Sequence, residues 1–119
     1  MKTILIVDDS AFTRSIHTQI IEALGHQVIE AGSGAEAVKI FQEKHPDLVI
    51  MDLLMPDMDG LEAIGQILAI DPKAKTIICS TDKQKARQDD ARDVGVMVFL
   101  TKPIDTAQLS STLSNLLED

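Results

Sequence analysis

The sequence predicts a single α/β domain in which helices cover both faces of a parallel sheet. The chain has 119 residues, 45% of them hydrophobic, which is enough for one core of ordinary size. Short apolar runs alternate five times with longer amphipathic stretches, the order typical of strand–helix units joined by right-handed crossovers. Consecutive Val, Ile and Leu residues in several of these runs indicate strands that are buried on both faces.

Five short runs are the expected strands, and each is followed by a longer stretch with helical spacing. The strands are Thr3–Val7, Gln27–Ala31, Leu48–Met51, Thr76–Ser80 and Val96–Leu100. In sheets of this kind, ligands bind beyond the carboxyl ends of the strands, near the point where the strand order reverses. The residues that follow each strand are therefore the first place to search for chemistry.

The first two helices have clear boundaries in the sequence. The first, about Ala11–Leu24, carries an apolar residue at every fourth position, and Gly25 provides a stop. We expect its buried stripe to consist of Phe12, Ile16, Ile20 and Leu24. The second helix begins with a capping box, in which Ser33 and Glu36 have the S-x-x-E spacing.

The remaining helices differ in how much apolar surface they offer. One begins near Asp59-Gly60 and ends before Pro72, and the last begins at Asp105 with a leucine-rich face. Between them, the stretch of about Gln84–Asp93 contains only two apolar residues, both alanine. Such a helix buries little surface and is marginally stable. It is either a solvated surface helix or an element that is free to shift when a neighbouring site changes.

The composition argues against several functions. Eleven Lys and Arg residues against nineteen Asp and Glu give a net charge of −8, which disfavours nucleic-acid binding. The apolar run near the N-terminus is too short for a signal sequence or a membrane span. The single cysteine, Cys79, excludes an internal disulfide and a thiolate metal site, and we expect it to be buried. A soluble cytoplasmic domain is the expectation.

Charged and polar side chains follow four of the five strands. Asp8 and Asp9 end the first strand, Asp52 the third, Ser80 the fourth, and Lys102 follows the fifth. If these strands are neighbours, three carboxylates converge and repel one another unless a cation lies among them. Oxygen ligands of this kind suit Mg²⁺. The alternative explanation for Asp8 and Asp9 is that they simply cap a helix.

This set of groups supports a specific reaction. A carboxylate beside Mg²⁺ and a lysine can attack a phosphoryl group and become an acyl phosphate, because the cations offset the charge on the phosphoryl oxygens. Lys102 would hold the arriving anionic group.

Three segments of the chain resemble the receiver domains of two-component response regulators. They are Ile4-Leu5-Ile6-Val7-Asp8-Asp9-Ser10, the stretch from Asp47 to Gly60 with Asp52 and Met55-Pro56-Asp57-Met58-Asp59-Gly60, and Phe99-Leu100-Thr101-Lys102-Pro103. The resemblance extends over residues 1–119, as one receiver domain. It implies a doubly wound (βα)5 flavodoxin-like fold with a five-stranded parallel sheet in the order 2-1-3-4-5.

The resemblance also implies the roles of the site residues. Asp52 matches the phospho-acceptor, and Asp9 and Asp52 match direct Mg²⁺ ligands. Asp8 would act largely through a metal-bound water. Leu54 would supply its backbone carbonyl to the metal, and Lys102 would contact a phosphoryl oxygen.

Two further positions match the family's switch, in which Ser80 closes onto the phosphoryl group and Phe99 is the aromatic residue that then moves inward. Each also has an ordinary explanation, Phe99 as a core aromatic and Ser80 as a strand-ending hydroxyl. Pro103 would follow a cis peptide bond. Thr81 stands where a smaller residue is usual, which could alter access to the phosphoryl group. Leu54 and Asp82 occupy positions that tune hydrolysis, and we expect slow loss of the phosphoryl group because Leu54 cannot orient an attacking water.

The function implied is a phosphorylation-controlled binding module rather than an enzyme. Its donor would be a sensor histidine kinase or a histidine phosphotransfer protein, and its output an unidentified protein bound through the fourth and fifth helices and the fifth strand. We expect no nucleic-acid partner, no membrane insertion, and either a monomer or a phosphorylation-linked dimer. The alternatives are a Mg²⁺-dependent phosphohydrolase with an Asp nucleophile, and a receiver fragment of a larger regulator or hybrid kinase.

One motif and three histidines are set aside. Residues 32–37 match the G-x-G-x-x-A dinucleotide fingerprint, but they follow the second strand rather than the first, and the capping box explains them without a ligand. His17, His26 and His45 have no metal-ligand spacing.

Overall fold

Five strands and five helices alternate along the chain in the computed structural model, which describes residues 1–81 and 84–117. The strands are β1 (Thr3–Val7), β2 (Gln27–Ala31), β3 (Leu48–Asp52), β4 (Lys75–Ser80) and β5 (Val98–Thr101). The helices are α1 (Ala11–Ala23), α2 (Gly34–Lys44), α3 (Gly60–Ile70), α4 (Lys85–Val94) and α5 (Thr106–Leu117). The predicted strand–helix alternation is confirmed.

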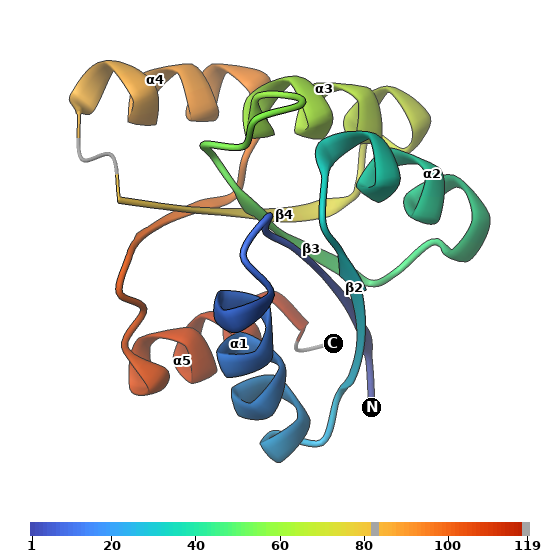
Figure 1. The fold of residues 1–119 in the computed structure, drawn as a ribbon, viewed down its shortest axis with the longest axis vertical. Helices are drawn as coiled ribbons and strands as arrows, with labels where there is room; N and C mark the ends of the chain where they lie inside the picture. Colours follow the sequence, from blue (N-terminus) through green and yellow to red (C-terminus); the bar gives the residue numbers. More distant parts are fainter. Residues whose placement is uncertain (82–83, 118–119) are drawn as a thin grey trace.

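The strands form one parallel sheet in the order β2-β1-β3-β4-β5, as expected (Figure 1). The strand order reverses between β1 and β3, because β2 lies on one side of β1 and β3, β4 and β5 follow on the other side. The carboxyl ends of β1 and β3 therefore lie side by side at the switch point, where ligands bind in folds of this class.

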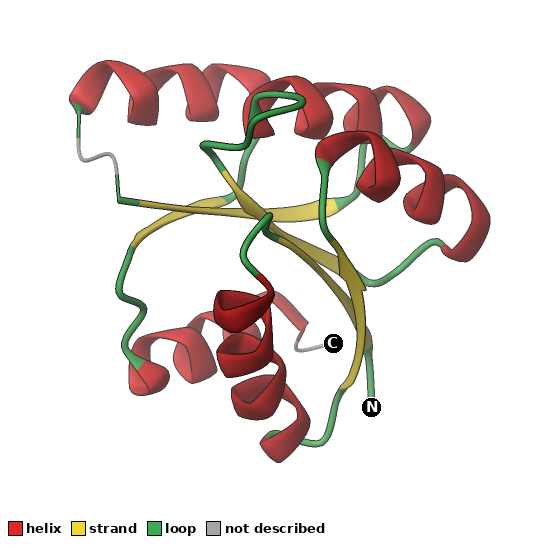
Figure 2. Ribbon diagram, viewed as in Figure 1, coloured by secondary structure: helices red, strands yellow, loops and turns green. Residues whose placement is uncertain are grey.

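Helices cover both faces of the sheet (Figure 2), and the buried residues form two separate apolar cores. One core lies beneath α2, α3 and α4 and includes Leu5, Phe41, Val49 and Ile64. The other lies beneath α1 and α5 and includes Ile6, Ile21, Ile50 and Leu109. Alternate residues of the central strands enter opposite cores, which is why these strands read as continuous apolar runs.

The expected buried stripe of α1 is wrong. Phe12 is 75% exposed, and Ile16 and Leu24 are also exposed, while the buried residues of the helix are His17 and Ile21. Only Ile20 of the expected stripe packs against the core, and only in part. The helix is turned so that Arg14 and His17 lie on the side of the sheet and the acidic strand ends. A helix face that carries polar side chains cannot be recognised from apolar periodicity.

The last strand begins two residues later than expected. Gly95 ends α4 in the left-handed conformation, with φ of 115°, and the N–H of Val96 donates back to Ala91 O at 3.0 Å. The first bond toward the sheet comes from the N–H of Met97, which donates to Thr76 O. Residue 96 therefore belongs to the helix ending rather than to β5.

Helix α4 buries one residue, Ala91, in agreement with the expectation that it offers little apolar surface. Helix α2 begins at its predicted cap, where Ser33 Oγ accepts from the Glu36 N–H at 3.2 Å. Cys79 is buried in β4, and burial raises the pKa of its thiol to about 12. Asp82, which was expected to tune hydrolysis, lies outside the described residues.

Among the described helices, the longest has 13 residues, and none combines the length and apolar character that a membrane span requires.

Candidate functional site

Three carboxylates meet at the switch point of the sheet. Asp52 is the last residue of β3, and Asp8 and Asp9 follow directly after β1. One carboxylate oxygen from each residue lies within 4.8 Å of the others. Asp8 and Asp52 are buried, whereas Asp9 is exposed. The predicted convergence of these side chains is therefore confirmed.

Lys102 reaches the same point from the end of β5. Its Nζ lies 2.7 Å from Asp8 Oδ2 and 3.2 Å from Asp52 Oδ1. Its backbone N–H donates to Ser80 O at 2.8 Å, which continues the pairing of β4 with β5. The Lys102–Pro103 peptide is cis, as expected. The ammonium group is thus shared by two of the three acidic residues.

Burial and charge act in opposite directions at this site. Burial raises the pKa of Asp52, and the charges of Asp8 and Asp9 raise it further, against the opposing effect of Lys102. Burial alone would lower the pKa of Lys102, but its hydrogen bond to Asp8 and the charge of Asp52 raise it above the ordinary value. The site therefore carries more negative charge than its own lysine compensates.

The loop after β1 has a defined backbone geometry. The Asp8 N–H donates to Ala31 O at 3.2 Å, and Asp8 Oδ1 accepts from the Ser10 N–H at 2.9 Å. Ser10 in turn caps α1, because its Oγ accepts from the Thr13 N–H at 3.2 Å. The cap of α1 is therefore Ser10, and the explanation of Asp8 and Asp9 as helix caps is wrong.

The backbone behind Asp52 has room only for glycine at position 60. A Cβ added to Gly60 would lie 2.2 Å from Asp52 O and 2.9 Å from Leu53 Cα. The Gly60 N–H donates to Leu53 O at 2.9 Å. The start of α3 therefore lies directly against the strand end that presents Asp52. The Asp59-Gly60 sequence at a helix start suggests that some part of the chain approaches closely there. It does not indicate that this part is the backbone of Asp52 and Leu53.

The predicted switch residues lie on β4, the strand next to Asp52, and on β5 beyond it. Ser80 is the buried last residue of β4, in register with Thr101, and Thr81 beyond it is exposed. Phe99 is partly buried and borders a cavity of about 180 Å³ beneath α4, together with Gln88, Ala91, Arg92, Val96 and Met97. Leu54 lies two residues after the end of β3 and is 53% exposed.

The loop between β3 and α3 is tied to two other helices. Asp57 accepts weakly from the N–H groups of Gly34 and Ala35, at 3.4 and 3.3 Å, at the start of α2. Asp59 caps α3 through Oδ1 and pairs through Oδ2 with Arg87 of α4, at 2.6 Å. Four amides of the G-x-G-x-x-A segment, those of Gly32, Gly34, Ala35 and Glu36, thus donate to side chains of the chain itself, which supports the capping interpretation of that segment.

Two residues next to the site, Arg14 and His17, have no signal in the sequence that marks them as site residues. Arg14 donates to the backbone carbonyl of Asp8, and His17 is buried on the same face of α1. Burial lowers the pKa of His17, and the charge of Lys102 lowers it further, which favours the neutral imidazole. Neither residue lies at the end of a strand, so a search of strand ends does not find them.

The chemistry of the acidic cluster fits Mg²⁺. Its three candidate ligands are all carboxylates, the hard oxygen donors that Mg²⁺ prefers. The negative charge that Lys102 leaves uncompensated is what a divalent cation would neutralise.

Comparisons with known proteins agree with this site. Residues 4–114 match the response regulator receiver domain family. The chemotaxis protein CheY of Thermotoga maritima is 42% identical over 114 residues, which cover 95% of each chain. CheY of Bacillus subtilis is 40% identical over 115 residues, covering 96% of each chain. A crystal structure of the CheX–CheY–BeF3–Mg²⁺ complex from Borrelia burgdorferi superposes with a TM-score of 0.93 at 31% identity, covering 99% of this chain and 90% of that one.

The fold and the acidic site define a receiver module of two-component signalling. The chain belongs to the response regulator receiver domain family, and it is a phosphorylation-dependent signalling switch. The members of this class are signalling proteins rather than enzymes in the ordinary sense.

Proposed function

We propose that Asp52 accepts a phosphoryl group, in a Mg²⁺-dependent reaction, from the phosphohistidine of a sensor histidine kinase or a histidine phosphotransfer protein. The observation that carries this proposal is the position of Asp52. Its carboxylate lies among the Asp8 and Asp9 carboxylates, within 4.8 Å, and its Oδ1 lies 3.2 Å from Lys102 Nζ.

Each residue of the site has a separate role in the proposed reaction. A carboxylate oxygen of Asp52 attacks the phosphorus, the bond to the donor nitrogen breaks, and an acyl phosphate forms. Asp9, Asp52 and the backbone carbonyl of Leu54 would hold Mg²⁺ directly, with Asp8 acting through a bound water. When bound there, the metal would offset the charge on the phosphoryl oxygens. Lys102 is placed to bind one of those oxygens and to favour acceptance of the group.

We further propose that phosphorylation changes the surface formed by α4, β5 and α5. The phosphoryl group presents new acceptor oxygens, and the Ser80 hydroxyl donates to one of them, which draws the loop after β4 inward. Phe99 then moves toward the vacated space. The cavity of about 180 Å³ between Phe99 and α4 indicates that the ring is not tightly packed on that side, and the weak anchoring of α4 by Ala91 and the Arg87–Asp59 ion pair supports a shift of the helix.

The proposed output is a contact with another protein. The relatives are named chemotaxis proteins, and the Borrelia burgdorferi structure is a complex of CheY with CheX. These names favour a sensory pathway with a protein target. The coverage of 95% of the Thermotoga maritima CheY supports one receiver domain over residues 1–119.

Acetyl phosphate provides the test of phosphoryl acceptance. The protein is incubated with acetyl phosphate with and without Mg²⁺, the intact mass is recorded, and the released phosphate is measured. We expect a lasting adduct of one phosphoryl group that requires Mg²⁺ and is absent in Asp52→Asn. The matched control is Asp57→Asn, which removes an exposed carboxylate of the same loop and leaves the adduct.

The same experiment distinguishes the alternative phosphohydrolase. A hydrolase with an Asp nucleophile would release phosphate over many turnovers without accumulating the adduct. Unchanged labelling of Asp52→Asn would overturn the assignment of the acceptor.

A further inference from the structure

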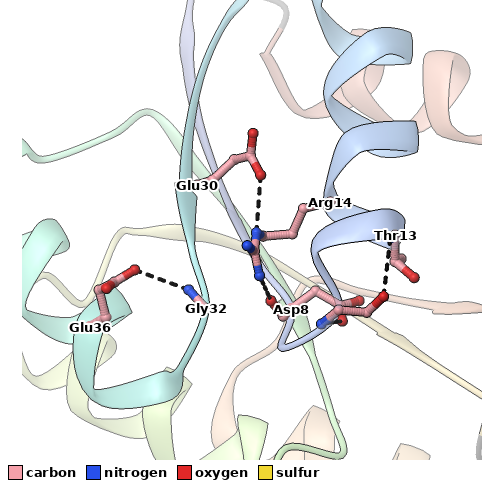
Figure 3. Close-up of polar contacts among 7 residues, drawn as sticks. Asp8, Thr13, Arg14, Glu30, Gly32 and Glu36 are labelled. Atoms are coloured by element: carbon pink, nitrogen blue, oxygen red, sulfur yellow. Dashed lines mark hydrogen bonds and ion pairs between the residues drawn. The ribbon is translucent and has the colours of Figure 1, made fainter.

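Arg14 connects the loop that carries Asp8 and Asp9 to the neighbouring strand β2. Its Nη1 donates to Asp8 O at 2.5 Å, and its Nε donates to Glu30 Oε1 at 3.0 Å. Figure 3 shows the guanidinium group between the two acceptors, with Arg14 extending from the first turn of α1. The Arg14 side chain is only 19% exposed, whereas that of Glu30 is 42% exposed.

The Asp8 carbonyl determines how Asp9 is presented. Asp8 O and the Asp9 N–H belong to one planar peptide unit, so the bond to Arg14 fixes the orientation of the peptide from which Asp9 departs. The Asp8 N–H and carboxylate already bond to Ala31, Ser10 and Lys102. The remaining direction of freedom is rotation of the peptide between residues 8 and 9, and Arg14 restricts that rotation.

Asp9 needs this restraint more than the other two acidic residues do. Asp52 is held in β3, and Asp8 is buried with bonds to both carboxylate oxygens. Asp9 is exposed, and its position depends on the backbone that carries it. Groups that orient a metal ligand from behind commonly change metal affinity by about 10- to 100-fold.

We propose that Arg14 is a positioning residue, which acts with Glu30 to orient the 8–9 peptide so that Asp9 faces the cation. This inference rests on the proposed Mg²⁺ site. Glu30 serves to hold the guanidinium in place, because both bonds come from one rigid, planar group.

Charge and positioning predict opposite effects of substitution, which makes the inference testable. As a cation near three carboxylates, Arg14 would weaken Mg²⁺ binding through its charge, so that Arg14→Gln would bind the metal more tightly. As a positioning residue, Arg14 strengthens binding, so that Arg14→Gln binds it more weakly. Arg14→Lys keeps the positive charge but lacks the planar guanidinium group that bonds to Asp8 and Glu30 together. A loss of Mg²⁺ affinity in this variant therefore reports on positioning and not on charge.

The experiment measures Mg²⁺ affinity by isothermal titration calorimetry and stability by thermal unfolding without Mg²⁺. We expect Arg14→Lys and Arg14→Gln to bind Mg²⁺ about tenfold more weakly than the wild type, and Glu30→Gln to show a smaller loss in the same direction. The amide ¹⁵N resonance of Asp9 should shift in both Arg14 variants, because the carbonyl of its peptide loses the arginine donor, and should shift less in Glu30→Gln, which keeps that donor. Arg92→Gln is the matched control. It removes an arginine of α4 whose side chain is 75% exposed, and it should leave the Mg²⁺ affinity unchanged.

The outcomes separate this inference from the proposed function. Wild-type Mg²⁺ binding together with unchanged or tighter binding by both Arg14 variants would overturn the positioning role and leave the metal site standing. Loss of thermal stability alone, with wild-type affinity in the folded variants, would overturn it as well. If both Arg14 variants fail to fold, the affinity of Glu30→Gln decides, and wild-type affinity in that variant overturns the inference. Absence of Mg²⁺ binding by the wild type would overturn the proposed function and the inference with it.

Discussion

Lys102 Nζ lies 2.7 Å from Asp8 Oδ2, although the two residues are 94 positions apart in the chain. This contact joins the end of β5 to the end of β1 across the two strands between them. It places one cation against a carboxylate whose side chain is 4% exposed, and the same ammonium group reaches Asp52. The site is therefore assembled by the parallel sheet as a whole and not by any local segment.

Removal of the Lys102 charge should destabilise the fold. In Lys102→Met, the buried Asp8 carboxylate loses its charged partner, and we expect the free energy of unfolding to fall by about 2 kcal/mol at pH 7. Chemical denaturation measures the change. Lys39→Met, on the exposed side of α2, is the control and should change stability by less than about 0.5 kcal/mol. Equal stability of the two variants would contradict the described ion pair.

Asp52 should lower the stability of the metal-free protein. Its pKa is raised above 3.8, chiefly by burial, so the folded state favours the protonated acid. The stability that this provides is present below pH 3.8 and is lost as the pH rises through the folded-state pKa. We therefore expect Asp52→Asn to be more stable than the wild type by about 1 kcal/mol at pH 7.

The stability gain of Asp52→Asn should shrink as the pH falls toward 3.8, and thermal unfolding from pH 4 to pH 7 measures it. Saturating Mg²⁺ should raise the melting temperature of the wild type, because the ligand binds only the folded state, and should raise that of Asp52→Asn less. A wild type that is more stable than the variant at pH 7 without Mg²⁺ would refute this prediction.

Two glycines of α3 should respond oppositely to alanine. In Gly60→Ala, the new Cβ would meet the backbone of Asp52 at 2.2 Å, so the strand end must move, and we expect a loss of about 2 kcal/mol with slower phosphorylation by acetyl phosphate. Gly65 has no heavy atom within 4 Å of an added Cβ. Gly65→Ala should therefore gain about 0.5–1 kcal/mol from helix propensity and leave phosphorylation unchanged. Similar effects of the two substitutions would argue against the close approach behind Asp52.

The Leu54 side chain should prolong the phosphorylated state. It is apolar and 53% exposed, and it lies two residues after Asp52, so it offers no hydrogen bond to orient an attacking water. Leu54→Asn adds such a group. We expect the acyl phosphate to decay several-fold faster, because a side-chain amide can hydrogen-bond to the attacking water and orient it. The decay of the phosphorylated mass after removal of acetyl phosphate measures the rate, with Leu54→Met as the apolar control. An unchanged half-life in Leu54→Asn would remove Leu54 from the account.

Much of this fold could be predicted from the sequence because its strands are buried on both faces. The bounds of β1 and β2 agree with the prediction, and the capping box at Ser33 marks the start of α2 within one residue. The orientation of α1 could not be predicted, because its inward face carries Arg14 and His17 next to the acidic site. A criterion based on apolar residues selects the opposite side of the helix, which carries Phe12 and Ile16.

The acidic site was predictable as a set of residues, because the ends of parallel strands meet at one edge. The restraints that arrange it were not. The Arg14 bond to Asp8 O and the close packing of Gly60 against Asp52 involve backbone oxygen atoms. Every residue type has such an atom, so the sequence does not reveal which residue is contacted. The predicted roles of Ser80, Phe99 and Leu54 stay predictions, since they concern the phosphorylated state.

A calorimetric titration of the protein with Mg²⁺ tests the central claim most directly. We expect one bound ion per chain in the wild type and a large loss of affinity in Asp9→Asn, which keeps the exposed position of the side chain but removes its charge. Absence of Mg²⁺ binding by the folded wild type, or equal affinity in Asp9→Asn, would contradict the claim that Asp8, Asp9 and Asp52 form one cation site.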